Sequence, residues 1–275
     1  MCTIIIDSNP AEQGRGDAGA SANDVKGSTL GVLKMHIPKI TQFLSACIIG
    51  ALACGPGYAA EKSLETDSPL VVLGMSPVNQ KSYDTILKIL LEDAKHSRRE
   101  TGILSWDLFQ PEDGKMDLLA MERYQNRTIF EQHIEKPYVK VFIETIPTAV
   151  REGEAQAAIF MKDLLPATSK PISSPLTTKN IIAVLPLRQE SAESVIPALL
   201  NVATAARQEQ GNLVYNVSQE IESPHRIVVF QRWETSQAYD AHQRQASVVA
   251  LDKLLTTALP QSHHEIWRAV RDIGH

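Results

Sequence analysis

The stretch Glu100-Thr101-Gly102-Ile103-Leu104-Ser105-Trp106 occurs a second time, in altered form, as Glu209-Gln210-Gly211-Asn212-Leu213-Val214-Tyr215. Each copy is followed, at the same spacing, by an acidic or amide residue, an arginine and an aromatic residue. This triplet is Glu122-Arg123-Tyr124 in the first copy and Gln231-Arg232-Trp233 in the second. The shared pattern indicates an internal duplication, so fold and function are read repeat by repeat.

The spacing of the two copies is constant. His133 and His242 complete the pattern, and every matched pair of residues lies 109 positions apart. The offset holds without a gap from Pro77 and Pro186 onward, as far as Val139 and its partner Val248. A constant spacing over this length is not expected by chance.

The hydrophobic pattern predicts the elements of the first repeat. In order they are a buried strand at Leu70–Leu73, a helix from Ser82 that Gly102 ends, hairpin strands at Ile103–Phe109 and Leu118–Tyr124, a helix over Thr128–Thr145 and a last strand over Ala155–Met161. Gly102 and Gly211 stand where a helix end favours a left-handed residue, which glycine adopts at little cost.

The second repeat predicts the same order. Its elements are a strand at Ile181–Leu187, a helix with Val195, Leu199, Val202 and Ala206 on one face, a hairpin over Leu213–Trp233, a helix from about Ser236 that carries His242 and a final strand over Glu265–Val270. The β-α-β-β-α-β order is ferredoxin-like, so we expect an α+β fold. The predicted domains are residues 66–164 and 179–275, joined by a linker rich in Pro, Ser and Thr at 165–178.

The chain before residue 66 has a different character. Residues 1–34 are rich in Gly, Ala, Ser and Asp and predict a disordered or wrongly included extension, with Met35 as the true start. Residues 35–60 resemble a cleaved signal peptide: a short cationic lead, an apolar run to Cys54, and small residues at Gly57 and Ala59. This predicts a secreted or periplasmic mature protein that begins near Ala60. A membrane anchor, an internal helix and a lipoprotein signal at Cys47 are the alternatives.

Composition narrows the classes of function. The net charge of −5 provides no basic surface for nucleic acid. All three cysteines precede residue 60, so the body of the protein has no cysteine for a metal site or a thiol nucleophile. The sequence contains no GxGxxG after a strand and no P-loop, so neither a flavin nor a nucleotide site is predicted. His263-His264 is expected to be a solvated pair rather than a metal site.

With these motifs the chain resembles the antibiotic biosynthesis monooxygenase superfamily, over about residues 70–160 and 179–270. The matching positions include Glu100, Gly102, Leu104, Glu209, Gly211 and Leu213, together with the site residues named below. The resemblance implies small α+β barrels that pair sheet to sheet, and for many members a cofactor-free oxidation of quinols or polyphenols. It therefore predicts that the two repeats pack together as a pseudo-dimer within one chain; further pairing of chains is left open. The haem-degrading branch differs, because it has Trp where His133 and His242 stand.

The resemblance also implies the site. The catalytic candidates are His133, Glu122 and His242, and the candidates for substrate binding are Trp106, Tyr124, Tyr215 and Trp233. A neutral imidazole can accept a phenolic proton, after which an electron-rich aromatic passes an electron to dioxygen without a cofactor. Repeat two has Gln231 where the family usually has Glu, so repeat one is expected to carry most of the activity.

A structural explanation competes for each of these residues. The four aromatic side chains fall on hairpin strands, where aromatic residues usually pack in a core. Each histidine could instead satisfy a buried polar group. The alternative to a monooxygenase is therefore a catalytically silent barrel that binds a small apolar ligand or serves assembly. An enclosed cavity beside His133 or His242 would favour catalysis, and space filled by side chains would favour the silent barrel.

Overall fold

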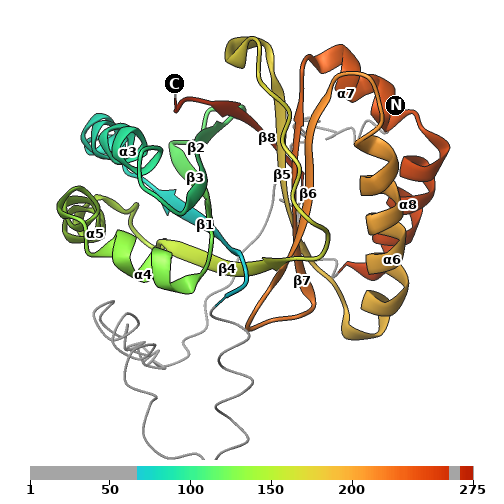
Figure 1. Cartoon of the computed structure of the whole chain (residues 1–275), viewed down its shortest axis with the longest axis horizontal. Coiled ribbons are helices and arrows are strands. Elements are labelled where there is room, and N and C mark those ends of the chain that lie inside the picture. Colours follow the sequence, from blue (N-terminus) through green and yellow to red (C-terminus); the bar gives the residue numbers. More distant parts are fainter. Residues whose placement is uncertain (1–66, 260–266, 275) are drawn as a thin grey trace, which may run out of the picture. The chain divides into compact units, whose positions relative to one another are not determined.

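The computed structural model describes residues 67–259 and 267–274 (Figure 1). The extension 1–34, the signal peptide 35–60 and His263-His264 lie outside the described residues. The elements of repeat one are β1 Leu70–Pro77, α3 Tyr83–Ser97, β2 Ile103–Pro111, β3 Asp117–Tyr124, α4 Arg127–Ile134, α5 Pro137–Ala149 and β4 Ala157–Asp163. Those that follow are η1 Pro175–Thr177, β5 Lys179–Pro186, α6 Gln189–Ala206, β6 Asn212–Glu220, β7 Arg226–Trp233, α7 Ser236–Gln243, α8 Ala246–Ala258 and β8 Trp267–Asp272.

The strands of both repeats form one closed barrel in the order β1-β3-β2-β8-β5-β7-β6-β4. Within each repeat the strands pair antiparallel, as β1 does with β3 from Leu70↔Tyr124 to Pro77↔Asp117. The two sheets join at two seams, where β2 pairs with β8 and β4 pairs with β6. The expected pseudo-dimer of two ferredoxin-like repeats within one chain is confirmed, and its edge strands are paired rather than exposed.

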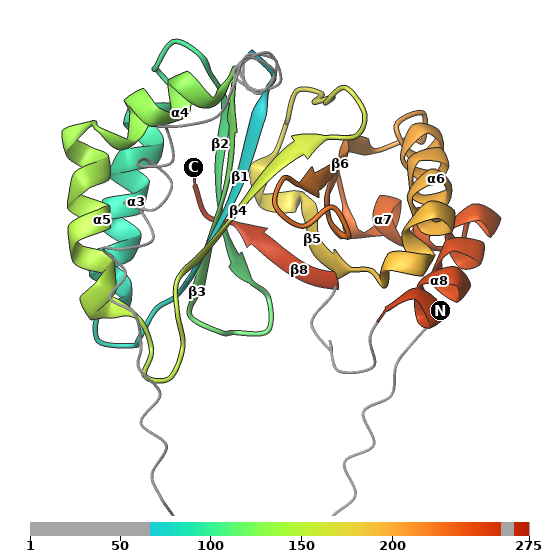
Figure 2. The same ribbon diagram turned by 90° about the horizontal axis from the view of Figure 1, so that it is seen from below.

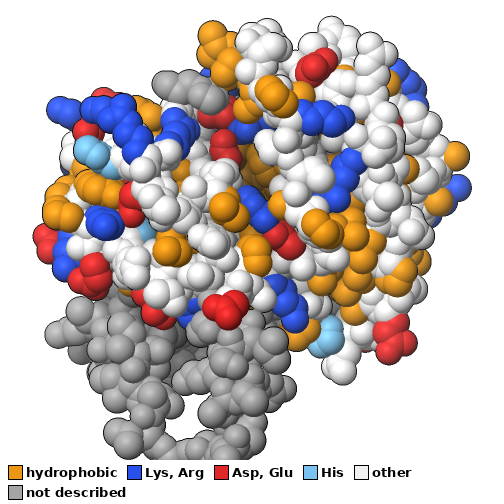
Figure 3. Space-filling model, viewed as in Figure 1, with side chains coloured by type: hydrophobic (Ala, Val, Ile, Leu, Met, Phe, Trp, Pro, Cys, Tyr) orange, Lys and Arg blue, Asp and Glu red, His pale blue; other side chains and the backbone are white. Residues whose placement is uncertain are grey.

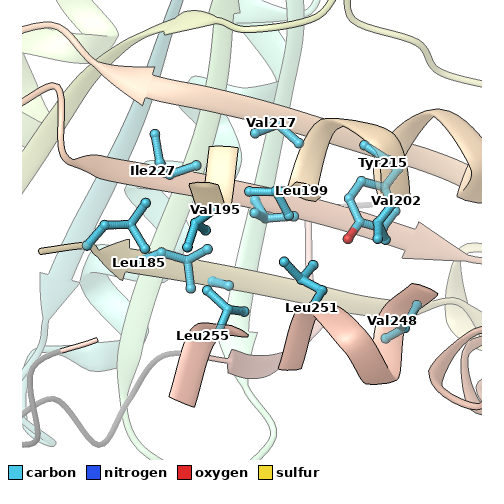
Figure 4. Close-up of a cluster of buried hydrophobic side chains, with 14 of the residues drawn as sticks. Leu185, Val195, Leu199, Val202, Tyr215, Val217, Ile227, Val248, Leu251 and Leu255 are labelled. Carbon is cyan, nitrogen blue, oxygen red and sulfur yellow. The ribbon is translucent and has the colours of Figure 1, made fainter. Parts of the chain in front are cut away.

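Helices cover the outside of each sheet. In repeat one, α3 and α5 pack on the sheet through a core that includes Ile86, Leu90 and Ile146 (Figure 2). In repeat two, α6 and α8 do the same (Figure 4). The side chains labelled there come from both helices and from β5, β6 and β7. None of the described helices is long and apolar enough to cross a membrane.

Strand alternation separates an inner core from these two outer cores. On β3, Leu119 and Met121 belong to the cluster inside the barrel, whereas Leu118 and Ala120 pack beneath the helices. Successive side chains of a strand point to opposite faces, so each strand serves both cores. This alternation decides which side of the sheet every candidate residue occupies.

The single helix expected over Thr128–Thr145 is wrong. The structure has two helices there, α4 and α5, with Lys136 in an extended conformation between them. Pro137 explains part of this break, because the residue before proline is pushed out of the helical region. Repeat two breaks at the matched place without a proline, since Gln245 is also extended. The turn between the two helices is therefore a feature of the fold.

The expected role of the motif glycines needs correction. Helices α3 and α6 end at Ser97 and Ala206, several residues before Gly102 and Gly211. Both glycines do have positive φ, +92° and +80°, but they close the turn into the next strand. An added Cβ at Gly211 would lie 2.6 Å from the Ala238 Cβ. The glycine is thus also required by the close approach of α7.

Candidate active site

The catalytic and substrate-binding candidates predicted from the sequence lie between each sheet and its helices. Glu122 and Tyr124 project from β3 to the helix side, because Met121 and Arg123, which alternate with them along the strand, line the inside of the barrel. Trp106 on β2 packs in the same helix-side core. His133 comes from the last turn of α4, which begins where the Asn126 side chain accepts a hydrogen bond from the Ile129 amide at 3.0 Å. Because α4 follows directly after β3 and its start is fixed by this cap, its last turn places His133 over the sheet.

His133 is 2 % exposed and its ring is held by Glu100. The Nδ1 atom lies 2.8 Å from Glu100 Oε1, and the Tyr138 hydroxyl donates to the same oxygen at 2.5 Å. An ionised Glu100 carboxylate can only accept hydrogen bonds, so the Nδ1 atom of His133 carries the proton and donates it to Glu100. This leaves Nε2 as the accepting atom of the neutral ring.

A second buried carboxyl faces the other ring nitrogen. Asp93 on α3 has its Oδ1 atom 4.0 Å from His133 Nε2, and it accepts a hydrogen bond from the Ser97 hydroxyl at 2.6 Å. Burial raises the pKa of Asp93, and this effect outweighs the lowering by Ser97 and His133. Charging either Asp93 or His133 therefore favours the charged form of the other.

Glu122 is the most perturbed carboxyl group of this region. The Tyr124 hydroxyl donates a hydrogen bond to its Oε2 atom, and the residue is part-buried. Burial raises the pKa of Glu122 to about 7, although the hydrogen bond from Tyr124 and the nearby His133 both lower it. Part of the residue stays accessible, but the dense protein around the carboxyl removes most of its hydration. It titrates close to neutral pH, as a general acid or base requires.

Glu122 and His133 are neighbours without a direct hydrogen bond among the described residues. The Nδ1 proton of His133 goes to Glu100, while the Glu122 carboxyl takes the Tyr124 hydroxyl. Tyr124 contacts both groups, since its hydroxyl donates to Glu122 and its ring lies 5.4 Å from the His133 ring. The two residues therefore influence each other through charge rather than through a shared proton.

Repeat two repeats the histidine contact. The Nδ1 atom of His242 lies 3.0 and 3.2 Å from the two carboxylate oxygens of Glu209, and His242 is 1 % exposed. Its Nε2 atom is buried and has no hydrogen-bond partner among the described residues. The Trp233 ring lies 4.6 Å from the His242 ring, and the Tyr215 ring lies 5.6 Å away, edge to face. Side chains therefore fill the space around this histidine.

The residue that corresponds to Glu122 differs in repeat two. In repeat two, Gln231 is buried and accepts a hydrogen bond from the Trp233 indole nitrogen at 3.0 Å. An amide has no ionisable proton, so this position cannot exchange one with a substrate. All four aromatic candidates are buried; Tyr124, Tyr215 and Trp233 contact a histidine, while Trp106 packs with α3 and α5.

Sequence reasoning named the motif positions Glu100 and Glu209 without assigning them a role. Both hold a histidine, and the 109-residue offset that they share was the signal that could have revealed it. Asp93 was missed and Tyr138 was assigned no role, because their matched positions in repeat two are Val202 and Ser247. Within the described ranges, no group of three or more His, Cys, Asp or Glu side chains is arranged to hold a metal ion.

Two hollows lie away from both histidines. One is a cavity of about 260 Å³ inside the barrel, lined by the opposite face of β3 through Met121 and Arg123. The other is an open hollow of about 540 Å³ beside α3, next to Lys88, Lys95 and Arg99. Basic and acidic side chains are otherwise interspersed on the face drawn in Figure 3.

Comparison with known proteins identifies the family. The model of the antibiotic biosynthesis monooxygenase family matches residues 69–145 and again residues 180–252, which together make up more than half of the chain. The chain belongs to this family. The two matches coincide with the two halves of the barrel, so each repeat is a separate copy of the family domain.

Relatives of known sequence or structure agree with this assignment. An uncharacterised protein, sll1783 of Synechocystis, is 27% identical over 88 residues, which cover 32% of this chain and 60% of that protein. The structure of a candidate monooxygenase from Fusobacterium nucleatum has a TM-score of 0.67 at 14% identity, and covers 74% of this chain and 92% of that one. A candidate monooxygenase from Lactobacillus acidophilus has a TM-score of 0.61 at 15% identity, covering 74% and 94%. An alignment over three quarters of the chain must include both repeats, so the tandem barrel is shared; at these identities the likeness shows the fold alone.

Proposed function

We propose that this family member is a cofactor-independent monooxygenase that oxidises a quinol-like or polyphenolic aromatic with dioxygen, and that repeat one carries the reaction. The observation that carries the proposal is the Glu122 carboxyl, whose pKa is raised to about 7 by burial beside Tyr124 and His133. A base poised near neutral pH accepts a phenolic proton and returns it later without a large free-energy penalty.

The steps balance for a hydroquinone. Glu122 takes a phenolic proton, and the electron-rich anion passes one electron to dioxygen, which becomes superoxide. The two radicals join in a carbon–oxygen bond to form a peroxide. Glu122 returns its proton to the peroxide. The ring carbon that bears the peroxide then loses its hydrogen as a proton while the O–O bond breaks, so that this carbon becomes a carbonyl and the departing hydroxide takes up a proton and leaves as water. Hydroquinone and O2 thus give a hydroxyquinone and water. The cationic form of His133, supported by Glu100, would stabilise the negative charge that develops.

The alternative is the catalytically silent barrel. Neither of the two hollows lies beside His133 or His242, so the cavity criterion favours it for both repeats. The close packing of Trp233 and Tyr215 around His242 favours it further for repeat two, where no ionisable group occupies the position of Glu122. In repeat one the packing is less complete, because Glu122 and Tyr138 are part-buried rather than buried. We therefore assign the reaction to repeat one and a supporting role to repeat two.

Oxygen uptake by the full chain against a panel of hydroquinones tests the proposal. We expect oxygen uptake with at least one of them. His133→Ala should lower the rate by roughly 10²–10⁴-fold, and His242→Ala should lower it far less. Thermal unfolding of both variants checks that each is folded. Larger losses from His242→Ala would place the reaction in repeat two. Small and equal losses, or no uptake by the parent protein with any compound, would support the silent barrel.

A further inference from the structure

The cavity inside the barrel lies on the opposite face of the sheet from the candidate active site. It measures about 260 Å³, close to the lower end of the range for small-molecule sites. Its apolar wall combines side chains from both repeats: Val71, Met121, Met161, Val214, Val228 and Phe230. Methionine sulfur and a phenylalanine ring make favourable contacts with aromatic rings, so this wall suits a flat aromatic body.

The charged groups at the cavity are already paired. Arg123 forms two hydrogen bonds to the Asp163 carboxylate, and Arg232 donates to Asp272 at 2.7 Å and to Asp107 at 3.2 Å. An anionic ligand would have to displace one of these carboxylates, which would leave a buried negative charge without a partner. Because such charges are costly, the pairing selects against acids.

Two polar side chains at matched positions of the repeats offer complementary hydrogen bonds. Asp107 on β2 uses its Oδ1 atom for Arg232, so its other oxygen is an acceptor. Asn216 on β6 uses its Oδ1 atom to accept from the Thr168 amide at 3.1 Å, so its amide NH2 is a donor. The cavity thus offers one acceptor and one donor between apolar walls.

The connection between the repeats forms the remaining side of the cavity. Residues Ala167, Thr168 and Ser169 line it and are themselves exposed to solvent. This segment is fixed by the Thr168 contact and by the Lys170 amide, which donates to the Leu213 carbonyl at 3.0 Å. A ligand therefore has a short path to solvent at this side.

We propose that the barrel cavity is a second binding site, for a small neutral aromatic molecule that carries one hydrogen-bond donor and one acceptor, such as a phenol with a carbonyl group. The donor would face Asp107 and the acceptor would face Asn216. The proposal does not depend on the oxidation assigned to Glu122, because the two sites lie on opposite faces of β3.

Methyl NMR of the full chain labelled with [¹³C-methyl]methionine tests this. Two of the six methionines, Met121 and Met161, line the cavity, whereas Met116 does not. With 4′-hydroxyacetophenone as the probe, we expect saturable shifts of the Met121 and Met161 signals, assigned through Met→Leu variants, and no shift of Met116. The matched anion 4-hydroxybenzoate should produce no saturable shift. Glu122→Gln should bind the probe as the parent protein does.

Two variants link the shifts to the cavity. Val228→Phe fills it and should abolish the shifts, while Asp107→Asn weakens the acceptor and should raise the dissociation constant by roughly 5–30-fold. If Val228→Phe does not fold, Asp107→Asn alone decides. Any of four results would overturn the proposal. The first two are that the probe fails to bind up to its solubility limit, or that it shifts the Met116 signal as much as those of Met121 and Met161. The other two are that 4-hydroxybenzoate produces the same shifts, or that Asp107→Asn leaves the dissociation constant unchanged. Loss of probe binding in Glu122→Gln would place the ligand at the candidate active site instead.

Discussion

Repeat one and repeat two hold the same glutamate–histidine pair in the same place and surround it with different chemistry. The Glu100–His133 distance is 2.8 Å and the Glu209–His242 distance is 3.0 Å. Each histidine is buried near the end of a helix whose first turn is capped by a side chain, Asn126 or Thr235. The pair is therefore part of what the duplicated fold preserves.

The residues around the pair have diverged. Positions that hold Asp93, Glu122 and Tyr138 in repeat one hold Val202, Gln231 and Ser247 in repeat two. In repeat one these two acids and a phenol lie around His133: Asp93 is 4.0 Å from its Nε2 atom, and Tyr138 shares the Glu100 oxygen with its Nδ1 atom. In repeat two an amide replaces the central acid and a tryptophan covers the histidine. Because both repeats keep the glutamate–histidine pair, the pair alone does not distinguish an active repeat from a silent one, whereas the Glu122 carboxyl beside it does.

The largest expected effect is kinetic. Glu122→Gln keeps the size of the side chain and its contact with Tyr124 but removes the titrating proton. We expect it to lower kcat/KM for the active hydroquinone by roughly 10²–10⁴-fold. The matched change in repeat two, Gln231→Glu, should leave the rate unchanged. Equal rates for the parent protein and Glu122→Gln would remove the functional distinction between the repeats.

The next largest effect is the loss of stability expected when each of the two matched arginines, Arg123 and Arg232, is replaced. Arg232 is almost fully buried and donates to Asn180, Asp107 and Asp272. Arg232→Met would leave buried carboxylates without a partner, and should lower the free energy of unfolding by about 3–5 kcal/mol. The pair of Arg123 and Asp163 is more accessible, so Arg123→Met should cost about 1–2 kcal/mol. Urea denaturation measures both, and an equal or inverted order would contradict the argument.

The motif glycines provide a smaller comparison. Gly211→Ala combines a positive φ with a Cβ only 2.6 Å from the Ala238 methyl group, and should cost about 2–4 kcal/mol. Gly102→Ala meets the Ile129 side chain at 2.9 Å, which can adjust, so its cost should be lower. Gly153 has the same positive φ with open space around it, and Gly153→Ala should cost only about 1–2 kcal/mol. Thermal unfolding of the three variants checks this order, which fails if Gly153→Ala is the most destabilising.

The last comparison concerns the pH dependence of stability. Burial raises the folded-state pKa of Glu122 above its unfolded value, so its neutral form is the one that the fold favours. Its contribution to stability is full below the unfolded pKa of about 4.3 and is lost as pH rises through about 7. Relative to Glu122→Gln, the parent protein should therefore lose on the order of 3 kcal/mol between pH 4.5 and pH 8. A constant difference between the two in urea denaturation would refute this.

Much of the fold could be predicted from the sequence, because the duplication and the apolar periodicity follow directly from residue spacing. The element order and the two repeats are examples, whereas the pseudo-dimeric barrel was implied by the resemblance to the monooxygenase family. The break before Pro137 was missed because apolar residues continue across it at helical spacing. The true end of α3 was missed because Gly102, which does have positive φ, stands after a turn that the pattern does not mark.

The site was harder to predict than the fold. The spacing identified His133, Glu122 and their counterparts, but it could not show that Glu100 rather than Glu122 holds the histidine. That choice depends on how the turn after α3 approaches α4 in three dimensions. The raised pKa of Glu122 is equally invisible in a sequence, because it arises from the atoms that bury the carboxyl.

Titration of the glutamate side chains by ¹³C NMR tests the central claim most directly. The Glu122 carboxyl signal is identified by its loss in Glu122→Gln, and its chemical shift is followed from pH 4 to pH 9 in the full chain. We expect a midpoint near 7, set by the burial of this group in repeat one. A midpoint near 4.3, the usual value for a solvated glutamic acid, would contradict it and leave repeat one as silent as repeat two.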